Sequence, residues 1–133
     1  MKELTKAEEQ VMDYLWKLEK AFVKDILDEF PEPKPAYTTV STIVRILEKK
    51  CMVGYTAYGK NHQYHPLVTK KDYARLSFRH VLSKHFNSSV ERFASFFTSD
   101  RDVSLSELEE LKLLLEKEIE KRKEDENKKT LVS

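Results

Sequence analysis

The chain has 133 residues, of which 40% are hydrophobic and 35% are charged, and its formal net charge is +1. This composition is typical of a globular chain with one modest core or two small ones, and it excludes the disordered and membrane-embedded classes. No apolar run approaches the roughly 18 residues of a membrane span, and the start of the chain lacks a signal-peptide segment. The single cysteine, Cys51, cannot form an intramolecular disulfide, which agrees with a reducing compartment. We therefore expect a cytoplasmic protein with no membrane partner.

Two helices are predicted at the start of the chain. The first begins at a capping box formed by Thr5 and Glu8 and carries an apolar stripe that includes Val11. The second is shorter, covers residues 22–30 and must end at the proline-rich run 31–35. Those prolines form a stiff connection that fixes how the chain enters the next helix.

The third predicted helix, residues 37–50, has two different faces. Val40, Ile43, Val44 and Leu47 recur at helical spacing and form a core stripe. The opposite face combines cations with Ser and Thr, although these hydroxyl residues lower helix propensity. Small hydroxyls allow close approach to base edges, and cations hold a phosphate backbone, so we interpret this segment as a DNA-recognition helix. The predicted DNA contacts on it are Thr38, Thr39, Ser41, Thr42, Arg45 and Lys49.

For Thr39 a second explanation is equally good, because a threonine near a helix start can also cap the helix. A plain solvated face is the alternative for the whole outer side of the third helix.

The segment after this helix changes to extended periodicity. Residues 52–58 and 62–67 are rich in Val, Tyr and Thr and flank Gly59, Lys60 and Asn61, which predicts a β-hairpin with a basic tip. Three helices followed by a hairpin is the element order of a winged helix-turn-helix. Lys60 and Asn61 are predicted to contact a phosphate or the minor groove, and an ordinary polar turn is the alternative.

Basic residues are concentrated around the predicted recognition helix. Residues 34–79 hold nine Lys or Arg against two acids, Glu48 and Asp72, for a local charge of +7. The rest of the chain carries fifteen cations against twenty-one acids. The near-neutral total therefore hides a local positive field that could neutralise phosphates.

Three further helices are predicted in the second half of the chain. One follows Thr69 and reaches about Phe86, a short apolar one starts near Val90, and the last begins at a capping box of Ser104 and Glu107. They carry too few apolar residues for a thick core, and the last has only one narrow apolar stripe. We therefore predict a homodimer, which would present two recognition helices to a palindromic operator. The predicted dimerisation residues are Leu76, Val90, Phe93, Phe97, Leu108, Leu111, Leu115 and Ile119.

The predicted fold class is mainly α with a small β-hairpin. It combines an N-terminal winged helix-turn-helix with a C-terminal helical dimerisation domain. We place the DNA-binding domain at residues 1–68, the dimerisation domain at 69–123 and a charged, disordered tail at 124–133.

Several motifs of the chain resemble those of one known family. They are Leu-Thr-Lys-Ala-Glu at 4–8, Tyr-Thr-Thr-Val at 37–40 followed by Thr42 and Arg45, and Gly-Lys at 59–60 followed by Tyr-His-Pro-Leu at 64–67. In these motifs the sequence resembles the penicillinase-repressor family (BlaI, MecI and CopY types). The resemblance implies a dimeric transcriptional repressor with a winged helix and a helical dimerisation domain. It also implies a regulatory protease or another antirepressor as a further partner.

The chain departs from the family pattern at three places. Cys51 stands where family members usually have Gly after the recognition helix. Phe96-Phe97 replaces the Asn-Phe bond that is cleaved in the β-lactam-responsive members, and no cysteine follows Cys51, whereas the copper-responsive members carry Cys-x-Cys pairs. The resemblance therefore predicts neither cleavage at that bond nor copper sensing through those pairs.

Other classes of function are less well supported by the sequence. With two glycines in all, the chain has no phosphate-cradling loop and no nucleophile elbow, so we predict no enzymatic activity and no cofactor. We also predict no metal site, because His62 and His65 fall on opposite faces of a strand. The remaining alternative is a winged helix that binds protein without sequence-specific DNA binding. Such a surface would usually expose apolar side chains, whereas this one carries hydroxyls and cations.

Overall fold

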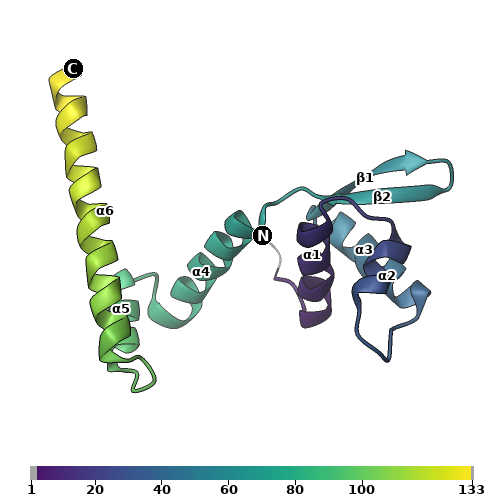
Figure 1. Cartoon of the computed structure of the whole chain (residues 1–133), viewed down its shortest axis with the longest axis horizontal. Helices are drawn as coiled ribbons and strands as arrows, with labels where there is room; N and C mark the ends of the chain where they lie inside the picture. Colours follow the sequence, from purple (N-terminus) through teal and green to yellow (C-terminus); the bar gives the residue numbers. More distant parts are fainter. Residues whose placement is uncertain (1–2, 133) are drawn as a thin grey trace. The chain divides into compact units, whose positions relative to one another are not determined.

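The computed structural model describes residues 3–132, which form six helices and one two-stranded sheet (Figure 1). In chain order the elements are α1 (Lys6–Leu18), α2 (Val23–Glu29), α3 (Tyr37–Lys49), β1 (Val53–Tyr58), β2 (Asn61–Pro66), α4 (Lys70–Phe86), α5 (Val90–Ser99) and α6 (Leu105–Val132). The fold is the predicted winged helix followed by a helical C-terminal region. It divides into two compact units, Met1–His80 and Val81–Ser133. Within the described range, no helix is both long and apolar enough to cross a membrane.

The first unit is built around one apolar core that α1, α2 and α3 share. Val40, Val44 and Leu47 of α3 are fully buried, as their helical spacing predicted, and Ile43 packs at the edge of the core. They meet fully buried side chains of the other two helices, namely Val11, Met12, Leu15 and Ile26. Burying one Val or Leu side chain contributes about 1.5–3 kcal/mol. This stripe therefore holds α3 against the core with its other face outward.

The predicted hairpin forms the wing. β1 and β2 pair antiparallel from Val53 opposite Pro66 to Tyr58 opposite Asn61, which leaves a two-residue turn. Gly59 in this turn has a φ of 63°, a left-handed conformation that costs glycine little.

A bridge that the sequence did not predict joins the wing to the helices. Ala21 lies between α1 and α2, and its backbone N–H donates to the Tyr64 carbonyl at 2.9 Å. The Tyr64 N–H donates to the Ala21 carbonyl in return, at 2.7 Å. These two bonds fix the wing beside α2 at the level of β2.

An ion pair joins the start of α1 to the C-terminal end of α3. Glu8 is only 4% exposed, and its carboxylate accepts hydrogen bonds from Lys50 Nζ, one of them at 3.0 Å. The predicted capping box adds the Thr5 backbone N–H, which donates to the same carboxylate at 3.4 Å. Burial raises the pKa of Glu8, but the hydrogen bonds from Lys50 and Thr5 outweigh burial and leave the pKa below its ordinary value of 4.5. The fold therefore stabilises the charged form.

The C-terminal end of α3 is closed by a Schellman motif. The Cys51 N–H donates to the Glu48 carbonyl at 3.0 Å, and the Met52 N–H donates to the Leu47 carbonyl at 2.9 Å. Cys51 has a φ of 62°, in the left-handed region. Cys51 therefore adopts the left-handed turn that Gly usually forms at this position. Its Cβ adds backbone strain that Gly would avoid.

The connection from α2 to α3 is held by a lysine. Lys34 Nζ donates to three carbonyl oxygens at the end of α2, those of Leu27, Asp28 and Phe30, at 3.4, 3.0 and 2.7 Å. A cation is favourable at this end of a helix because the last carbonyls carry partial negative charge. The proline-rich run therefore leaves α2 along a fixed path and sets where α3 begins.

The first half of α4 belongs to the first unit. Tyr73 donates through its hydroxyl to Glu9 Oε1 at 2.7 Å, and its ring lies 5.6 Å from the ring of Trp16. Trp16 in turn donates through Nε1 to the Val68 carbonyl at 2.8 Å. These contacts join the start of α4 to the first unit, which extends to His80.

The second unit buries few side chains within one copy of the chain. Leu82, at 2% exposed, is the one buried side chain among the described residues of this unit. Phe86 meets Phe93 at 5.5 Å and Phe96 at 5.3 Å between ring centroids, but Phe96 is still 59% exposed. One copy therefore leaves a large apolar area uncovered.

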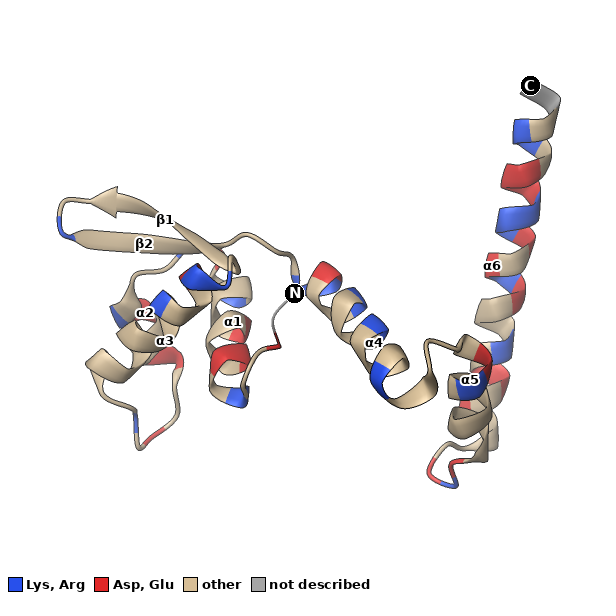
Figure 2. Cartoon of the chain, turned by 180° about the vertical axis from the view of Figure 1, so that it is seen from behind, with Lys and Arg blue, Asp and Glu red and all other residues tan. Residues whose placement is uncertain are grey.

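α6 extends further than the sequence analysis predicted. It continues to Val132, whereas fraying after Glu120 and a disordered tail at 124–133 were expected. Acids and bases alternate along it (Figure 2), and Arg122 Nε donates to Glu118 Oε1, four residues earlier, at 3.1 Å. Lys, Glu and Arg have high helix propensity, and such pairs add support. The charged residues after Glu120 suggested disorder, but such a sequence also suits a helix that is exposed to solvent on all sides.

Replacing Glu8 by Gln should lower the free energy of unfolding by about 1–3 kcal/mol near neutral pH, because Lys50 loses its charged partner. The folded-state pKa of Glu8 lies below the ordinary value of 4.5, so its stabilising contribution is complete above that value and is lost as the pH falls through the lower pKa. Denaturant unfolding of the wild type and Glu8→Gln should therefore converge in acid. Glu32→Gln, at an exposed loop position, is the control, and a deficit for Glu8→Gln that stays constant with pH would contradict this account.

Replacing Cys51 by Gly should raise stability by about 1 kcal/mol, because glycine adopts the left-handed conformation without a Cβ clash. Thermal unfolding measures the change, and Cys51→Val should lower the midpoint, since a β-branched side chain is poorly tolerated there. A loss of stability in Cys51→Gly would mean that the thiol makes a stabilising contact.

Candidate nucleic-acid interface

The predicted contact residues of α3 lie on its outward face. Thr38, Thr39, Thr42, Arg45 and Lys49 are exposed, and Ser41 is half-buried. None of them belongs to the core, and the core stripe of the same helix is fully buried. The helix therefore presents hydroxyls and cations to its surroundings as one surface.

The hydroxyl of Thr42 is already used within the helix. Thr42 Oγ1 donates to the Thr38 carbonyl at 2.8 Å, the back-bond that threonine often makes inside helices. Its hydrogen is therefore committed, and what remains for a ligand is the methyl group and the oxygen lone pairs. That set suits apolar contact with a thymine methyl better than donation to a base.

The start of α3 has no side-chain cap. Its N-cap is Ala36, and the Thr39 N–H donates to the Ala36 carbonyl at 3.0 Å. Thr39 is thus not the capping residue of α3. No acid lies in the first turn, which leaves this end of the helix favourable for a phosphate.

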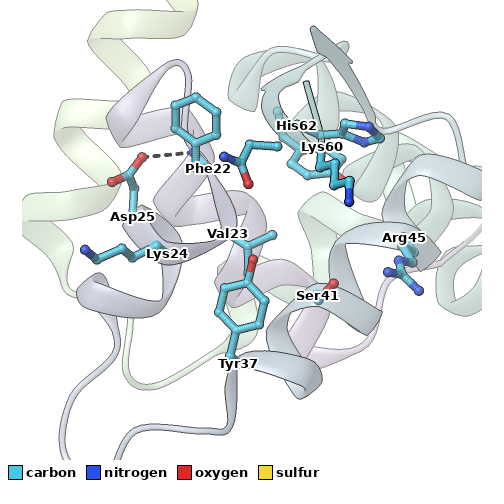
Figure 3. A pocket seen from close by; sticks show the side chains of 11 residues that line it. Phe22, Val23, Lys24, Asp25, Tyr37, Ser41, Arg45, Lys60 and His62 are labelled. Carbon is cyan, nitrogen blue, oxygen red and sulfur yellow. Dashed lines mark hydrogen bonds between the residues drawn. The ribbon is translucent and has the colours of Figure 1, made fainter. Parts of the chain in front are cut away.

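A cleft of about 560 Å³ lies between α2, α3 and the wing (Figure 3). It brings together four of the predicted DNA contacts, Ser41, Arg45, Lys60 and Asn61. The other four predicted contacts do not line it and lie elsewhere on the outer face of α3: Thr38, Thr39, Thr42 and Lys49. The remaining residues of the cleft are Phe22, Val23, Lys24, Asp25, Tyr37, His62 and Tyr64.

The cleft is electropositive. Three cations line it, Lys24, Arg45 and Lys60, against one acid, Asp25. The Asp25 carboxylate already accepts the Phe22 backbone N–H at 2.9 Å, which anchors the first turn of α2. The positive charge of the cleft is therefore only partly offset, and it continues onto α3, as the blue segments of Figure 2 show.

Aromatic side chains form part of the cleft wall, and the sequence analysis did not assign them to the site. Tyr37 is 54% exposed at the start of α3. His62 stacks on Tyr55 with ring centroids 4.0 Å apart and planes at 5°. Burial raises the pKa of the Tyr64 hydroxyl above its ordinary value. Strand alternation could have placed His62 on the face that Tyr64 shares, since the two are two residues apart.

Among the residues that the structure describes, no group of three or more His, Cys, Asp or Glu side chains is arranged to hold a metal ion. The outward groups available to a ligand are cations, hydroxyls and amides, which recognise anions and base edges.

The predicted dimerisation residues divide into two sets by burial. Half are exposed in one copy of the chain: Leu76, Val90, Leu115 and Ile119. The other half are partly buried within it: Phe93, Phe97, Leu108 and Leu111. Leu76 lies in the first unit, whereas the other seven lie in the second.

Comparison with known proteins gives consistent matches along most of the chain. The sequence profile of the family described as Penicillinase repressor matches residues 4–117. The methicillin resistance regulatory protein MecI of Staphylococcus aureus (strain N315) is 27% identical over 116 residues, which cover 86% of this chain and 94% of that protein. The penicillinase repressor of Bacillus licheniformis is 23% identical over 123 residues, which cover 92% of this chain and 96% of that protein.

Among solved structures, one described as a CopR repressor structure is 32% identical and has a TM-score of 0.43. It covers 50% of this chain, and 99% of that structure is matched.

Proposed function

The chain belongs to the penicillinase repressor family and is a transcriptional repressor, and we propose that it acts as a cytoplasmic homodimer on a palindromic operator. In this proposal α3 and the wing bind duplex DNA, and occupation of the operator blocks transcription. The observation that carries the proposal is the outer face of α3, where exposed hydroxyls and cations continue into the electropositive cleft.

Each part of this surface suits a different contact. Arg45 can pair with the O6 and N7 acceptors of guanine through its planar guanidinium. Thr38, Ser41 and Thr42 are short enough to let α3 approach the bases. Lys49 suits a phosphate.

The wing and the start of α3 would complete the contact. Lys60 and Asn61 follow Gly59 at the tip of the hairpin and are exposed, which suits a phosphate or the minor groove. The Thr39 hydroxyl, free of a capping role, suits a phosphate near the start of the helix.

Dimerisation is supported by the apolar surface of the second unit. Leu115 and Ile119 lie four residues apart on one side of α6, and their side chains are 54% and 52% exposed. A large uncovered apolar patch on a soluble chain marks an interaction surface. A second copy with the same patch would cover it and relate two recognition helices by a two-fold axis.

The alternative is a winged helix that binds protein without sequence-specific DNA binding. In its favour, α3 exposes two larger apolar groups, Tyr37 at 54% and Ile46 at 39%. The hydroxyls and cations beside them favour DNA. Binding to a duplex that weakens steeply with salt supports the DNA reading, and salt-insensitive binding to a protein supports the alternative.

Release from the operator would follow a route other than cleavage of an Asn-Phe bond. Phe96-Phe97 occupies that position, and it lies within α5, where Phe96 is exposed and Phe97 is half-buried. A regulatory protease or another antirepressor is therefore a proposed partner that acts at a site other than an Asn-Phe bond.

Replacing Arg45 by Ala should weaken operator binding by on the order of 1–3 kcal/mol and relax base preference at one position in each half-site. The probe is the duplex that the wild-type chain selects from a random pool, and fluorescence anisotropy gives the affinity for it and for its single-base variants. Arg101→Ala removes the same charge from the loop before α6 and should change neither quantity. If Arg45→Ala kept full affinity and selectivity, Arg45 would not read a base.

Replacing both Leu111 and Leu115 by Gln should give monomers that bind the operator weakly, because the shared apolar stripe of α6 becomes polar. Sedimentation equilibrium gives the mass, and circular dichroism checks that the helices are kept. Leu113→Gln is the matched control, since Leu113 is 59% exposed but lies two residues from Leu115, on another side of the helix. A double variant that remains dimeric would place the interface elsewhere.

A further inference from the structure

We infer that α2 is part of the DNA interface, with Lys24 as a phosphate contact that acts together with Arg45 and Lys60. In this inference the cleft between α2, α3 and the wing holds the backbone of one operator strand. It rests on the proposed function and adds a residue that neither the sequence motifs nor the outer face of α3 indicates.

Cations from three different elements line the cleft. Lys24 comes from α2, Arg45 from α3 and Lys60 from the turn of the wing, and all three line the same cleft. Figure 3 shows Lys24 on one side of Tyr37 and Arg45 on the other. Cations from three separate elements around one hollow create a local positive potential for a phosphate.

Among the described residues, these cations have no structural partner. Three other lysines of the first unit bind protein groups: Lys17 binds Glu29 at 2.8 Å, Lys34 caps α2, and Lys50 pairs with Glu8. Within the described part of the chain, Lys24, Arg45 and Lys60 make no ion pair and no side-chain hydrogen bond. Their charge is therefore available to a ligand, and replacing one of them removes no ion pair and no side-chain hydrogen bond of the described residues.

The cleft is continuous with the outer face of α3. Ser41 and Arg45 line the cleft and also lie on the outer side of α3. A DNA strand that follows α3 would therefore pass the cleft before it reaches the wing. The α2 side of that path is where Lys24 lies.

The chemistry of lysine indicates a phosphate and not a base as the target. In Figure 3 the ammonium of Lys24 is directed outward from the rim of the cleft, at the end of a flexible stem. Such a point charge lacks the planar fork that reads guanine, and it suits a phosphate oxygen. Each phosphate that a protein neutralises releases condensed counterions, which makes the contact measurable through salt dependence.

The test is a salt titration of Lys24→Gln on the duplex that the wild-type chain selects from a random pool. The slope of log K against log salt concentration should be less steep by about 0.9 than that of the wild type. The affinity should fall equally for the selected duplex and its single-base variants, because a phosphate contact carries no sequence information. Lys117→Gln removes the same charge from α6, outside the cleft, and should leave the slope unchanged.

Duplexes with single neutral methylphosphonates then locate the contact. At one phosphate per half-site the substitution should weaken the wild type but not Lys24→Gln. Identical methylphosphonate profiles and equal salt slopes for the two proteins would overturn the inference.

The experiments distinguish failure of the proposed DNA binding from failure of the proposed role of Lys24. If the wild type selects no duplex, the proposed function fails and the inference fails with it. If the wild type binds and Arg45→Ala weakens binding while Lys24→Gln does not, the role of α2 alone is refuted.

Discussion

The ion pair between Glu8 and Lys50 is the contact on which the position of α3 depends. Lys50 is the C-cap residue of α3, and Glu8 lies in the first turn of α1. A buried carboxylate is costly unless its charge is paired and hydrogen-bonded, and here Lys50 and the Thr5 N–H supply both. At the other end of the helix, Lys34 fixes the path of the chain into α3. With both ends held and the apolar stripe buried, the outer face has one orientation relative to the wing.

Some cations of the first unit bind protein groups, whereas others have no ion pair and no side-chain hydrogen bond among the described residues. Lys17, Lys34 and Lys50 satisfy carboxylates or helix carbonyls and maintain the fold. Those that line the cleft have no such task, and hydroxyls lie beside them on α3. A protein surface keeps unpaired charges in one place at a cost in self-repulsion, and a polyanion offsets that cost on binding. The unpaired cations and the hydroxyls that lie together on α3 and in the cleft are therefore the physical basis for interpreting this surface as a nucleic-acid interface.

Local sequence patterns predicted much of the fold because their causes are local. The capping boxes at Thr5 and Ser104 were recognisable, and both form as expected. The Ala21–Tyr64 bridge was missed, since a single extended residue between helices has no periodicity of its own. Lys24 was not among the predicted contacts for a different reason: it lines the same cleft as Arg45 only because of how α2 packs on α3, which no spacing in the sequence encodes. The end of α6 was misjudged because charge-rich sequence suits both a disordered tail and a solvated helix.

In the proposed function, two copies of α3 bind one operator as a symmetric pair. A hydroxyl-radical footprint of the wild-type chain on the duplex that it selects tests this symmetry. We predict two patches of protected backbone related by two-fold symmetry, with their centres separated by a whole number of helical turns. A single asymmetric patch, or uniform protection along any duplex, would contradict the proposed symmetry.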